Sequence, residues 1–316
     1  MALRWDRFVL SGLLLSLLVP GCEKAKQADR AEAQQRPPLA PSPMDWAPVA
    51  QALGKAGAMQ PGNVYKVGFP RSDLHVTVGQ VTVQPALALG SWLAFRQTAD
   101  SEAMVLGDLV LLESEVAPVM SQLEGSGIHP TALHNHLLHE SPPIRYLHIM
   151  GRGAPAKLAA GVRAALDLTR TPLAAAASAP AAAAPLGLDT AQIAQALGYH
   201  GNVNGGVYQV GVPRADTVTV DGVVIPPAMG VATAINIQPT GGGKAAVTGD
   251  FVLVVAEVNP LIQALRANHI EVTALHSHML GDSPRLYFLH FWANDDAVQL
   301  ARGLGTALAK MNVRKA

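Results

Sequence analysis

Six histidines with a repeated spacing are the residues best suited to chemistry in this 316-residue chain. They fall into two triplets, which are His134, His136 and His148 in one half and His276, His278 and His290 in the other. Three imidazoles that leave a fourth position open are typical of a catalytic site for zinc or another divalent transition metal. The spacing therefore predicts a metal site in each half, with zinc as the first choice. The alternative is that these histidines are buried, hydrogen-bonded residues of a sheet.

The segment that carries each triplet predicts a β-hairpin. Residues 131–148 read TALHNHLLHESPPIRYLH, in which a Ser-Pro turn separates two β-prone runs. Side chains alternate along a strand, so His134 and His136 share a face. A hairpin that is symmetric about Ser141 places His148 opposite His134 on that face. Residues 273–290, TALHSHMLGDSPRLYFLH, predict the same arrangement, so each half presents three imidazoles to one point.

Acidic residues recur at matched positions before both hairpins. Glu115 and Glu257 stand where a predicted strand passes into a helix, and a carboxylate near a metal can act as a general acid or base or as a fourth ligand. They are the predicted catalytic residues. The competing interpretation, which we favour, is that they stabilise the positive end of a helix dipole. Asp108 and Asp250 each follow a glycine and are expected to be turn residues at the start of a strand.

The motif Pro-Arg-x-Asp occurs once in each half. Its arginines, Arg71 and Arg214, are candidate substrate-binding residues, because a guanidinium pairs well with a carboxylate on a ligand. A local ion pair with Asp73 or Asp216 is the simpler explanation.

The two halves are copies of one domain. The histidine segments are offset by 142 residues (276 minus 134), and Val-Gly-x-Pro-Arg and Gly-Asp recur with them. We expect repeat domains at 45–168 and 188–316, joined by a linker at 169–187 that is rich in alanine and proline. Helices are expected at both ends of each copy, with short strands and hairpins between them. This pattern predicts an α+β fold with mainly antiparallel mixed sheets and flanking helices, packed as a pseudo-dimer.

The first residues predict export and lipid attachment. Residues 1–22 have a basic start, an apolar stretch too short to span a bilayer comfortably, and the ending Leu-Val-Pro-Gly-Cys, which resembles a bacterial lipobox. Cys22 is the chain's one cysteine, so we expect it to carry a lipid that tethers the protein to a membrane of the cell envelope, facing the periplasm or the exterior. An ordinary signal peptide with a chance cysteine is the alternative. Residues 23–44 predict a disordered spacer.

Composition excludes one class of partner and motifs disfavour one class of enzyme. The net charge is zero, with 23 acidic and 23 basic residues, and only 5% of residues are aromatic, so nucleic acid is not an expected partner. A zinc peptidase is disfavoured because the upstream His-x-x-x-Asp partner of the common wall-peptidase motif is missing. His129 and His139 have no counterpart in the second copy and are expected at the surface.

Four motifs resemble the LppY/LpqO family of bacterial lipoproteins. They are Val-Tyr-x-Val-Gly-x-Pro-Arg, Gly-Asp-x-Val-Leu, Thr-Ala-Leu-His-(Asn/Ser)-His and, at 288–297, Phe-Leu-His-Phe-Trp-Ala-Asn-Asp-Asp-Ala. The resemblance implies tandem domains and an envelope location, but no established activity. The histidine spacing alone is also similar to the zinc site of acetolactate decarboxylases, which is an analogy in favour of metal binding and does not carry over a reaction.

Together these features predict an envelope lipoprotein that binds a divalent metal and binds or acts on a small molecule. Whether it is an enzyme stays open at this point. The alternative is a non-catalytic envelope binding or assembly module with structural histidines.

Overall fold

Each repeat folds into an antiparallel sheet with its long helices on one face. The structure is a computed structural model, and it describes residues 42–173 and 186–315. The elements of the first repeat are α2 (Ala47–Leu53), β1 (Ala58–Gln60), β2 (Val64–Pro70), β3 (Val76–Val78), β4 (Val81–Val83), α3 (Pro85–Ala88), β5 (Gly90–Ala99), β6 (Glu102–Leu112), α4 (Glu113–Gly125), β7 (His129–His134), β8 (Glu140–Ser141), β9 (Ile144–Gly153) and α5 (Pro155–Leu166).

The second repeat has the same elements in the same order, with a 3-10 helix in place of α3. They are α6 (Thr190–Leu197), β10 (Asn202–Asn204), β11 (Val207–Pro213), β12 (Thr219–Val220), β13 (Val223–Val224), η1 (Pro227–Met229), β14 (Ala232–Gly241), β15 (Lys244–Leu253), α7 (Val255–Ala267), β16 (Glu271–His276), β17 (Asp282–Ser283), β18 (Tyr287–Asp296) and α8 (Ala297–Leu308).

The large sheets of the two repeats have equivalent strand orders. The first is β1-β2-β5-β6-β9-β7 and the second is β10-β11-β14-β15-β18-β16, with neighbouring strands antiparallel throughout. A small three-stranded sheet accompanies each, in the orders β4-β3-β8 and β13-β12-β17. The predicted α+β class with two homologous domains is confirmed.

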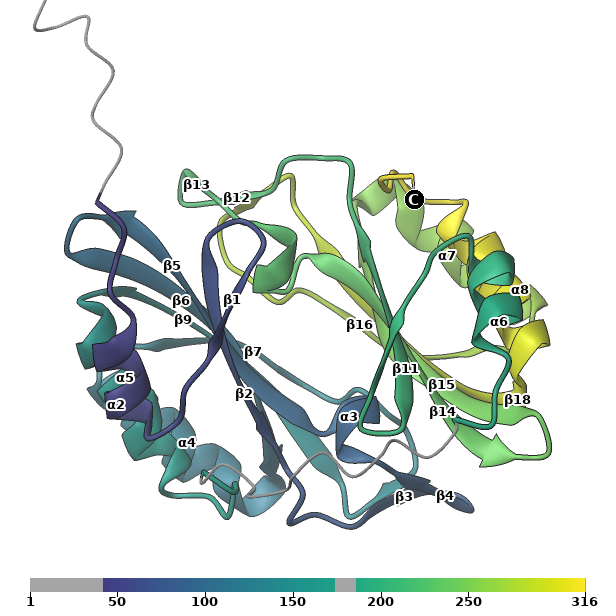
Figure 1. Ribbon diagram of the computed structural model, residues 1–316, viewed down its shortest axis with the longest axis horizontal. Helices are drawn as coiled ribbons and strands as arrows, with labels where there is room; N and C mark the ends of the chain where they lie inside the picture. Colours follow the sequence, from purple (N-terminus) through teal and green to yellow (C-terminus); the bar gives the residue numbers. More distant parts are fainter. Residues whose placement is uncertain (1–41, 174–185, 316) are drawn as a thin grey trace, which may run out of the picture. The chain divides into compact units, whose positions relative to one another are not determined.

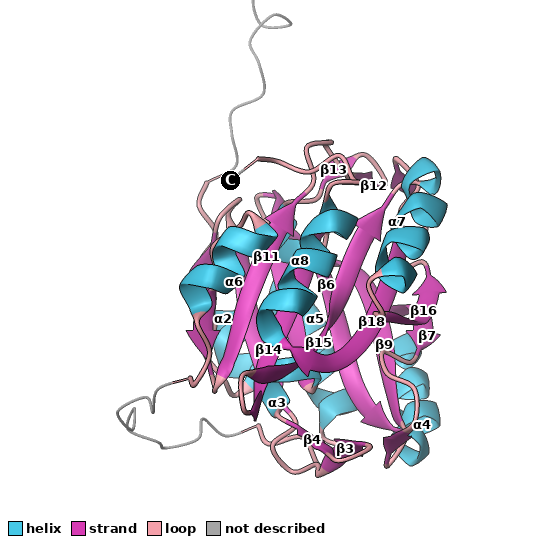
Figure 2. Cartoon of the chain, turned by 90° about the vertical axis from the view of Figure 1, so that its right-hand side faces the viewer, coloured by secondary structure: helices cyan, strands magenta, loops and turns pink. Residues whose placement is uncertain are grey.

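Successive side chains of the central strands point to opposite faces of the sheet, so each face contacts a different part of the protein. On β6, Val105 and Leu109 join the core beneath α2, α4 and α5. Leu106 and Val110 point the other way and belong to different clusters. Figure 2 shows the equivalent face of the second sheet covered by α6, α7 and α8.

The faces of the two sheets that lack the long helices pack against each other, with the short helices α3 and η1 between them. One shared cluster combines Met104 and Leu106 of the first repeat with Met279 and Phe288 of the second. A second cluster is built mainly from the first repeat and includes Val207 of the second. Figure 1 shows the resulting layers, with the long helices outside, both sheets inside and α3 between the sheets. The repeats are therefore halves of one unit, which begins at Pro43.

The segment between β7 and β9 differs from the predicted tight hairpin. β8 leaves the large sheet and pairs with β3 in the small one. As a result His134 lies opposite Tyr146, and His148 lies opposite Ala132. The predicted register is wrong by two residues, but an even shift leaves the histidines on the predicted face.

Several predicted segments lie outside the described residues, namely the signal peptide with Cys22, the spacer as far as residue 41 and the linker from 174 to 185. At the edges of that gap, Thr171 is buried and Leu173 packs on the first repeat's core, while Leu186 and Leu188 pack on the second's. No helix in the described part of the chain is both long and apolar enough to cross a bilayer.

The shared inner layer predicts that neither repeat is stable alone. Residues 43–173 and 186–315, expressed separately, should aggregate or self-associate, because each would expose the apolar sheet face that the other covers. Co-expression should restore a one-to-one complex, measured by size-exclusion chromatography with light scattering. A monomeric fragment with a cooperative melt would contradict this expectation.

Candidate functional site

The six repeated histidines converge on one place between the repeats. His134 and His276 end the edge strands β7 and β16, and their ring centroids are 3.7 Å apart. His136 and His148 of the first repeat stack on His290 and His278 of the second, with centroids 3.8 and 3.6 Å apart. The predicted triplets are each brought together, and the two lie side by side in one cluster rather than at separate places. Because β7 and β16 are the edge strands of two facing sheets, the fold brings their ends together.

Cross-repeat hydrogen bonds hold the two histidine loops in matched positions. The Thr131 hydroxyl donates to the carbonyl of His278 at 2.6 Å, and the Thr273 hydroxyl donates to the carbonyl of His136 at 2.5 Å. The threonine of each Thr-Ala-Leu-His-x-His motif thus positions the second histidine of the other repeat.

Two glycine carbonyls fix which ring nitrogen of two histidines is free. Nδ1 of His290 lies 2.9 Å from the carbonyl of Gly249, and His148 bonds in the same way to the backbone of Gly107. A donor bond from Nδ1 leaves Nε2 as the lone-pair nitrogen, which is the tautomer that metal-binding histidines need. A Cβ at Gly249 would overlap the carbonyl oxygen of Ala234, so glycine is required there.

Several other ring nitrogens of the cluster are buried without partners. Nε2 of His290 lies 3.3 Å from Nε2 of His134, the separation expected of two nitrogens bound to one tetrahedral zinc at about 2.0–2.1 Å each. The buried ring nitrogens with no hydrogen-bond partner are Nδ1 of His134, Nε2 of His136, Nε2 of His148, both nitrogens of His276 and Nε2 of His278. Such atoms are rare in proteins, because each loses its hydration without compensation.

Two groups of histidines have ligand atoms close enough to hold a single ion. The first is His134, His276, His278 and His290, and the second is His134, His136 and His148, with ligand atoms within 4.8 Å of one another in each. His134 belongs to both. Burial lowers the pKa of all six imidazoles, to about 4 for His276 and about 3 for His290. The rings are therefore neutral at pH 7, as metal ligands must be.

Asp108 and Asp250 are the acidic side chains beside the cluster. Asp108 oxygens lie 3.9 Å from Nε2 of both His136 and His148, and Asp250 oxygens lie 3.7 and 3.5 Å from His278 and His290. The expectation that these aspartates are turn residues was wrong, because they occupy the middles of β6 and β15. The repeated Gly-Asp pair is the sequence feature that could have identified these aspartates as site residues. The carbonyl of the glycine orients a histidine ring, and the aspartate side chain lies beside that ring.

Burial of these carboxyl groups disfavours their ionised form. Burial raises the pKa of Asp108 to about 7, with the nearby Lys66 ammonium opposing the shift. Burial also raises the pKa of Asp250 well above its ordinary value, and the charge of Asp108 adds to the effect. A divalent cation among the six rings would favour the ionised form of both aspartates.

The structure places the predicted catalytic and substrate-binding residues in ion pairs instead. Arg71 is fully buried, and its Nη1 donates to Glu115 at 2.8 Å and to the carbonyl of Val110 at 2.7 Å. Its Nε and Nη2 donate to Asp73. Glu115 also accepts from the backbone of Leu112, which caps α4. All the guanidinium donors are engaged, so Arg71 and Glu115 brace β6 and α4, and none of these bonds involves a histidine.

The second repeat repeats this brace. Arg214 bonds Glu257 at 2.6 Å, the carbonyl of Val252 at 2.8 Å, and Asp216. The glutamates lie at the starts of helices and the arginines form local pairs with aspartates. These positions agree with the alternative interpretations given for both kinds of residue.

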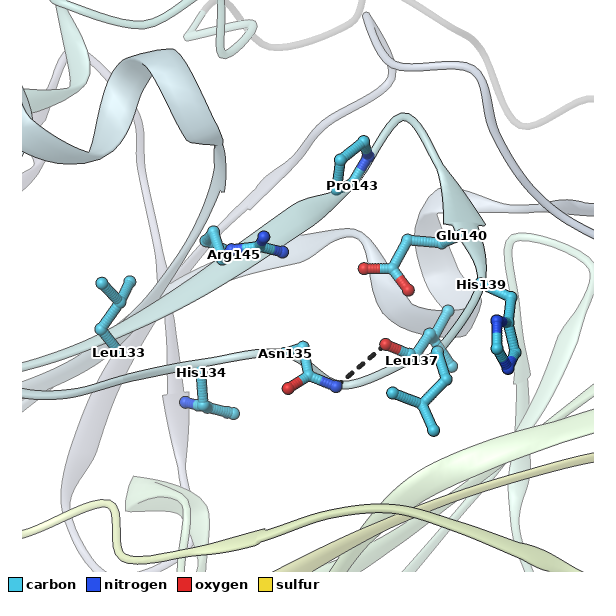
Figure 3. Close-up of a pocket in the computed structure, with 9 residues that line it drawn as sticks. Leu133, His134, Asn135, Leu137, His139, Glu140, Pro143 and Arg145 are labelled. Carbon is cyan, nitrogen blue, oxygen red and sulfur yellow. Dashed lines mark hydrogen bonds between the residues drawn. The ribbon is translucent and has the colours of Figure 1, made fainter.

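A cavity of about 510 Å³ opens beside the cluster on the first-repeat side. His134 forms part of its wall, so the cluster can be approached from there (Figure 3). The lining residues are Leu133, His134, Asn135, Leu137, Leu138, His139, Glu140, Pro143 and Arg145. The chain's five other histidines, at positions 75, 129, 139, 200 and 269, are exposed, as expected for His129 and His139.

Fold and site thus define a two-repeat α+β protein with a histidine-rich candidate metal centre between its repeats. Residues 47–168 and 191–310 match the family described as Domain of Unknown Function (DUF1259). The chain belongs to that family, and its two matched segments confirm the tandem repeat.

Other comparisons add little. No curated protein matches the chain significantly. Among solved structures, a trimeric bacterial microcompartment shell protein, PduB, aligns over 82% of this chain and 96% of its own, with 14% identity and a TM-score of 0.21. At that TM-score the likeness carries no argument.

The brace predicts a structural role for Glu115. Glu115→Gln should lower the free energy of unfolding by about 3 kcal/mol, because it leaves the buried Arg71 guanidinium partly uncompensated. Glu113→Gln is the matched control: this side chain is 74% exposed, so a change within about 0.5 kcal/mol is expected. Chemical denaturation measures both. Equal stability of the two variants would argue against the brace.

Proposed function

We propose that the protein binds a divalent transition metal, zinc foremost, through the histidine cluster between its repeats. The observation that carries this proposal is the set of buried imidazole nitrogens that converge without hydrogen-bond partners. His134 with His276, His278 and His290 would hold one ion, and His136 with His148 completes the alternative set.

The competing interpretation, structural histidines, explains less of the site. Buried structural imidazoles are expected to have both ring nitrogens hydrogen-bonded, as an uncompensated polar group costs about 1–3 kcal/mol. Both nitrogens of His276 lack partners. Aromatic stacking of His136 on Tyr146 and of His278 on Phe288 orients two of the rings, but it satisfies no nitrogen.

The site's surroundings favour a functional rather than a closed structural centre. His134 borders the open cavity, so a small molecule can reach the side of the cluster that faces solvent. A bound divalent metal would supply Lewis-acid activation there. Asp108 and Asp250 are the candidate proton-handling or ligand carboxylates in this chain, rather than Glu115 and Glu257. We propose binding of, or action on, a small molecule, and a non-catalytic binding module is the second candidate.

The proposal includes an envelope location. It is supported by the amino-terminal sequence, with its lipobox-like ending at Cys22, and by the motifs that resemble the LppY/LpqO lipoproteins. The lipid on Cys22 would tether the folded unit to a membrane, facing the periplasm or the exterior.

Metal binding is tested on the full chain with His134→Ala, since His134 belongs to both ligand groups. Wild-type protein should retain zinc by elemental analysis and melt at a lower temperature after chelation. Zinc at a hundredfold its Kd should add about 2.7 kcal/mol to the free energy of unfolding. The variant should lose zinc affinity by at least about tenfold.

His139→Ala is the matched control, because His139 is exposed on the same loop and lies in neither group. It should keep wild-type zinc affinity. The wild-type protein could instead hold no zinc and show no response to chelator, while His134→Ala lowers its stability. That result would mean that the histidines are structural.

The envelope location is tested with Cys22→Ser, which should move the protein from the membrane fraction to the soluble fraction of the cells. The reason is that the lipid on this residue is the anchor we propose. Immunoblotting of the two fractions measures it. A Cys22→Ser variant whose signal peptide is removed and which still stays in the membrane fraction would exclude lipid anchoring.

A further inference from the structure

The two pseudo-symmetric loops beside the cluster are held by different hydrogen bonds. In the second repeat, Arg285 donates to Asp282 at 2.8 Å, to the carbonyl of Met279 at 3.2 Å and to Ser277 at 3.1 Å. These bonds tie the loop after β16 to the start of β18. Pro143 occupies the equivalent place in the first repeat, and a proline side chain cannot make them.

The loop of the first repeat borders a cavity whose wall carries an available cation. Arg145 takes the place that Tyr287 has in the second repeat, and its Nη1 donates to the carbonyl of Ile144 at 3.0 Å. Its Nη2 lies 3.8 Å from Glu113, a carboxylate that is 74% exposed. Nε of Arg145 makes no hydrogen bond within the described part of the chain. The guanidinium is thus held at the cavity wall with donors to spare, unlike those of Arg71 and Arg214.

A carboxylate from the loop faces the same space. Figure 3 shows the charged ends of Glu140 and Arg145 turned toward the cavity from opposite sides. Burial raises the pKa of Glu140, and the charge of Arg145 is close enough to oppose that shift, yet the two form no ion pair within 4.0 Å. Leu133, Leu137 and Leu138 make much of the remaining wall apolar.

Resting on the proposed metal site, we propose that this cavity binds a small carboxylate with a short apolar chain, anchored by Arg145 and lying beside His134. A cavity of about 510 Å³ suits a small metabolite. Arg145 offers the planar donor pair that carboxylates prefer. Glu140 disfavours a dianion such as phosphate by repulsion, and the leucines provide contacts for the chain. The second repeat, with Tyr287 and a tied loop, has no equivalent anchor.

Isovalerate, a branched short-chain carboxylate, is the probe. Calorimetric titration of the zinc-loaded full chain should show saturable binding. Arg145→Leu should weaken it at least about tenfold, and Arg145→Lys should weaken it less. Arg152→Leu is the charge-matched control, because Arg152 lies on the same strand with a side chain that is 51% exposed, and it should bind as wild type. Inorganic phosphate should bind more weakly than isovalerate.

Metal content and circular dichroism are measured on every variant, so the two proposals fail separately. Zinc-loaded protein that shows no saturable isovalerate binding, binds it equally in Arg145→Leu, or prefers phosphate overturns the carboxylate pocket and leaves the metal centre standing. Protein that holds no zinc but still binds isovalerate through Arg145 supports the pocket and overturns the metal proposal.

Discussion

The enclosure of six imidazoles, three buried and three half-buried, between two facing sheets is the constraint on which this structure depends. A layer of this kind is otherwise closed by apolar contacts such as those of Met104, Leu106 and Phe288. Here the edge strands β7 and β16 bring polar rings into it, and their pKa values fall because a charge there is poorly solvated. A fold that keeps so many unpaired nitrogens in one place gives up stability, which a metal ion would restore.

Hydrogen bonds and ion pairs from both repeats support the cluster. The Thr131 and Thr273 hydroxyls cross between the repeats to hold the histidine loops, and the carbonyls of Gly107 and Gly249 fix two ring tautomers. Farther out, the Arg71–Glu115 and Arg214–Glu257 pairs lock the strand that carries each aspartate to the helix that follows it. Preorganisation of this kind keeps ligands in position before an ion or substrate arrives.

Duplication produced a nearly symmetric site whose two entrances have diverged. The first repeat has Pro143 in place of Arg285 and Arg145 in place of Tyr287, so its loop lacks the Arg285 hydrogen bonds and carries a guanidinium at its cavity. The histidines of the two repeats are arranged symmetrically, but the cavity beside them lies on one side only. A two-repeat protein could in this way keep one metal centre and direct a ligand to one side of it. Both repeats are then needed, one for the entrance and both for the ligands.

The sequence by itself determined the repeat, the α+β class, the six histidines and their common face. The reason is that side-chain alternation along a strand is a local pattern, and a repeat with a period of 142 residues is found by comparing the sequence with itself. Only the tertiary structure decided that the two triplets form one cluster. It also decided that Asp108 and Asp250, and not Glu115 and Glu257, lie beside the rings. The physical reason is that a repeat pattern describes each copy alone, whereas the packing of two sheet faces, and the ion pair that a buried arginine must make, depend on residues distant in the chain.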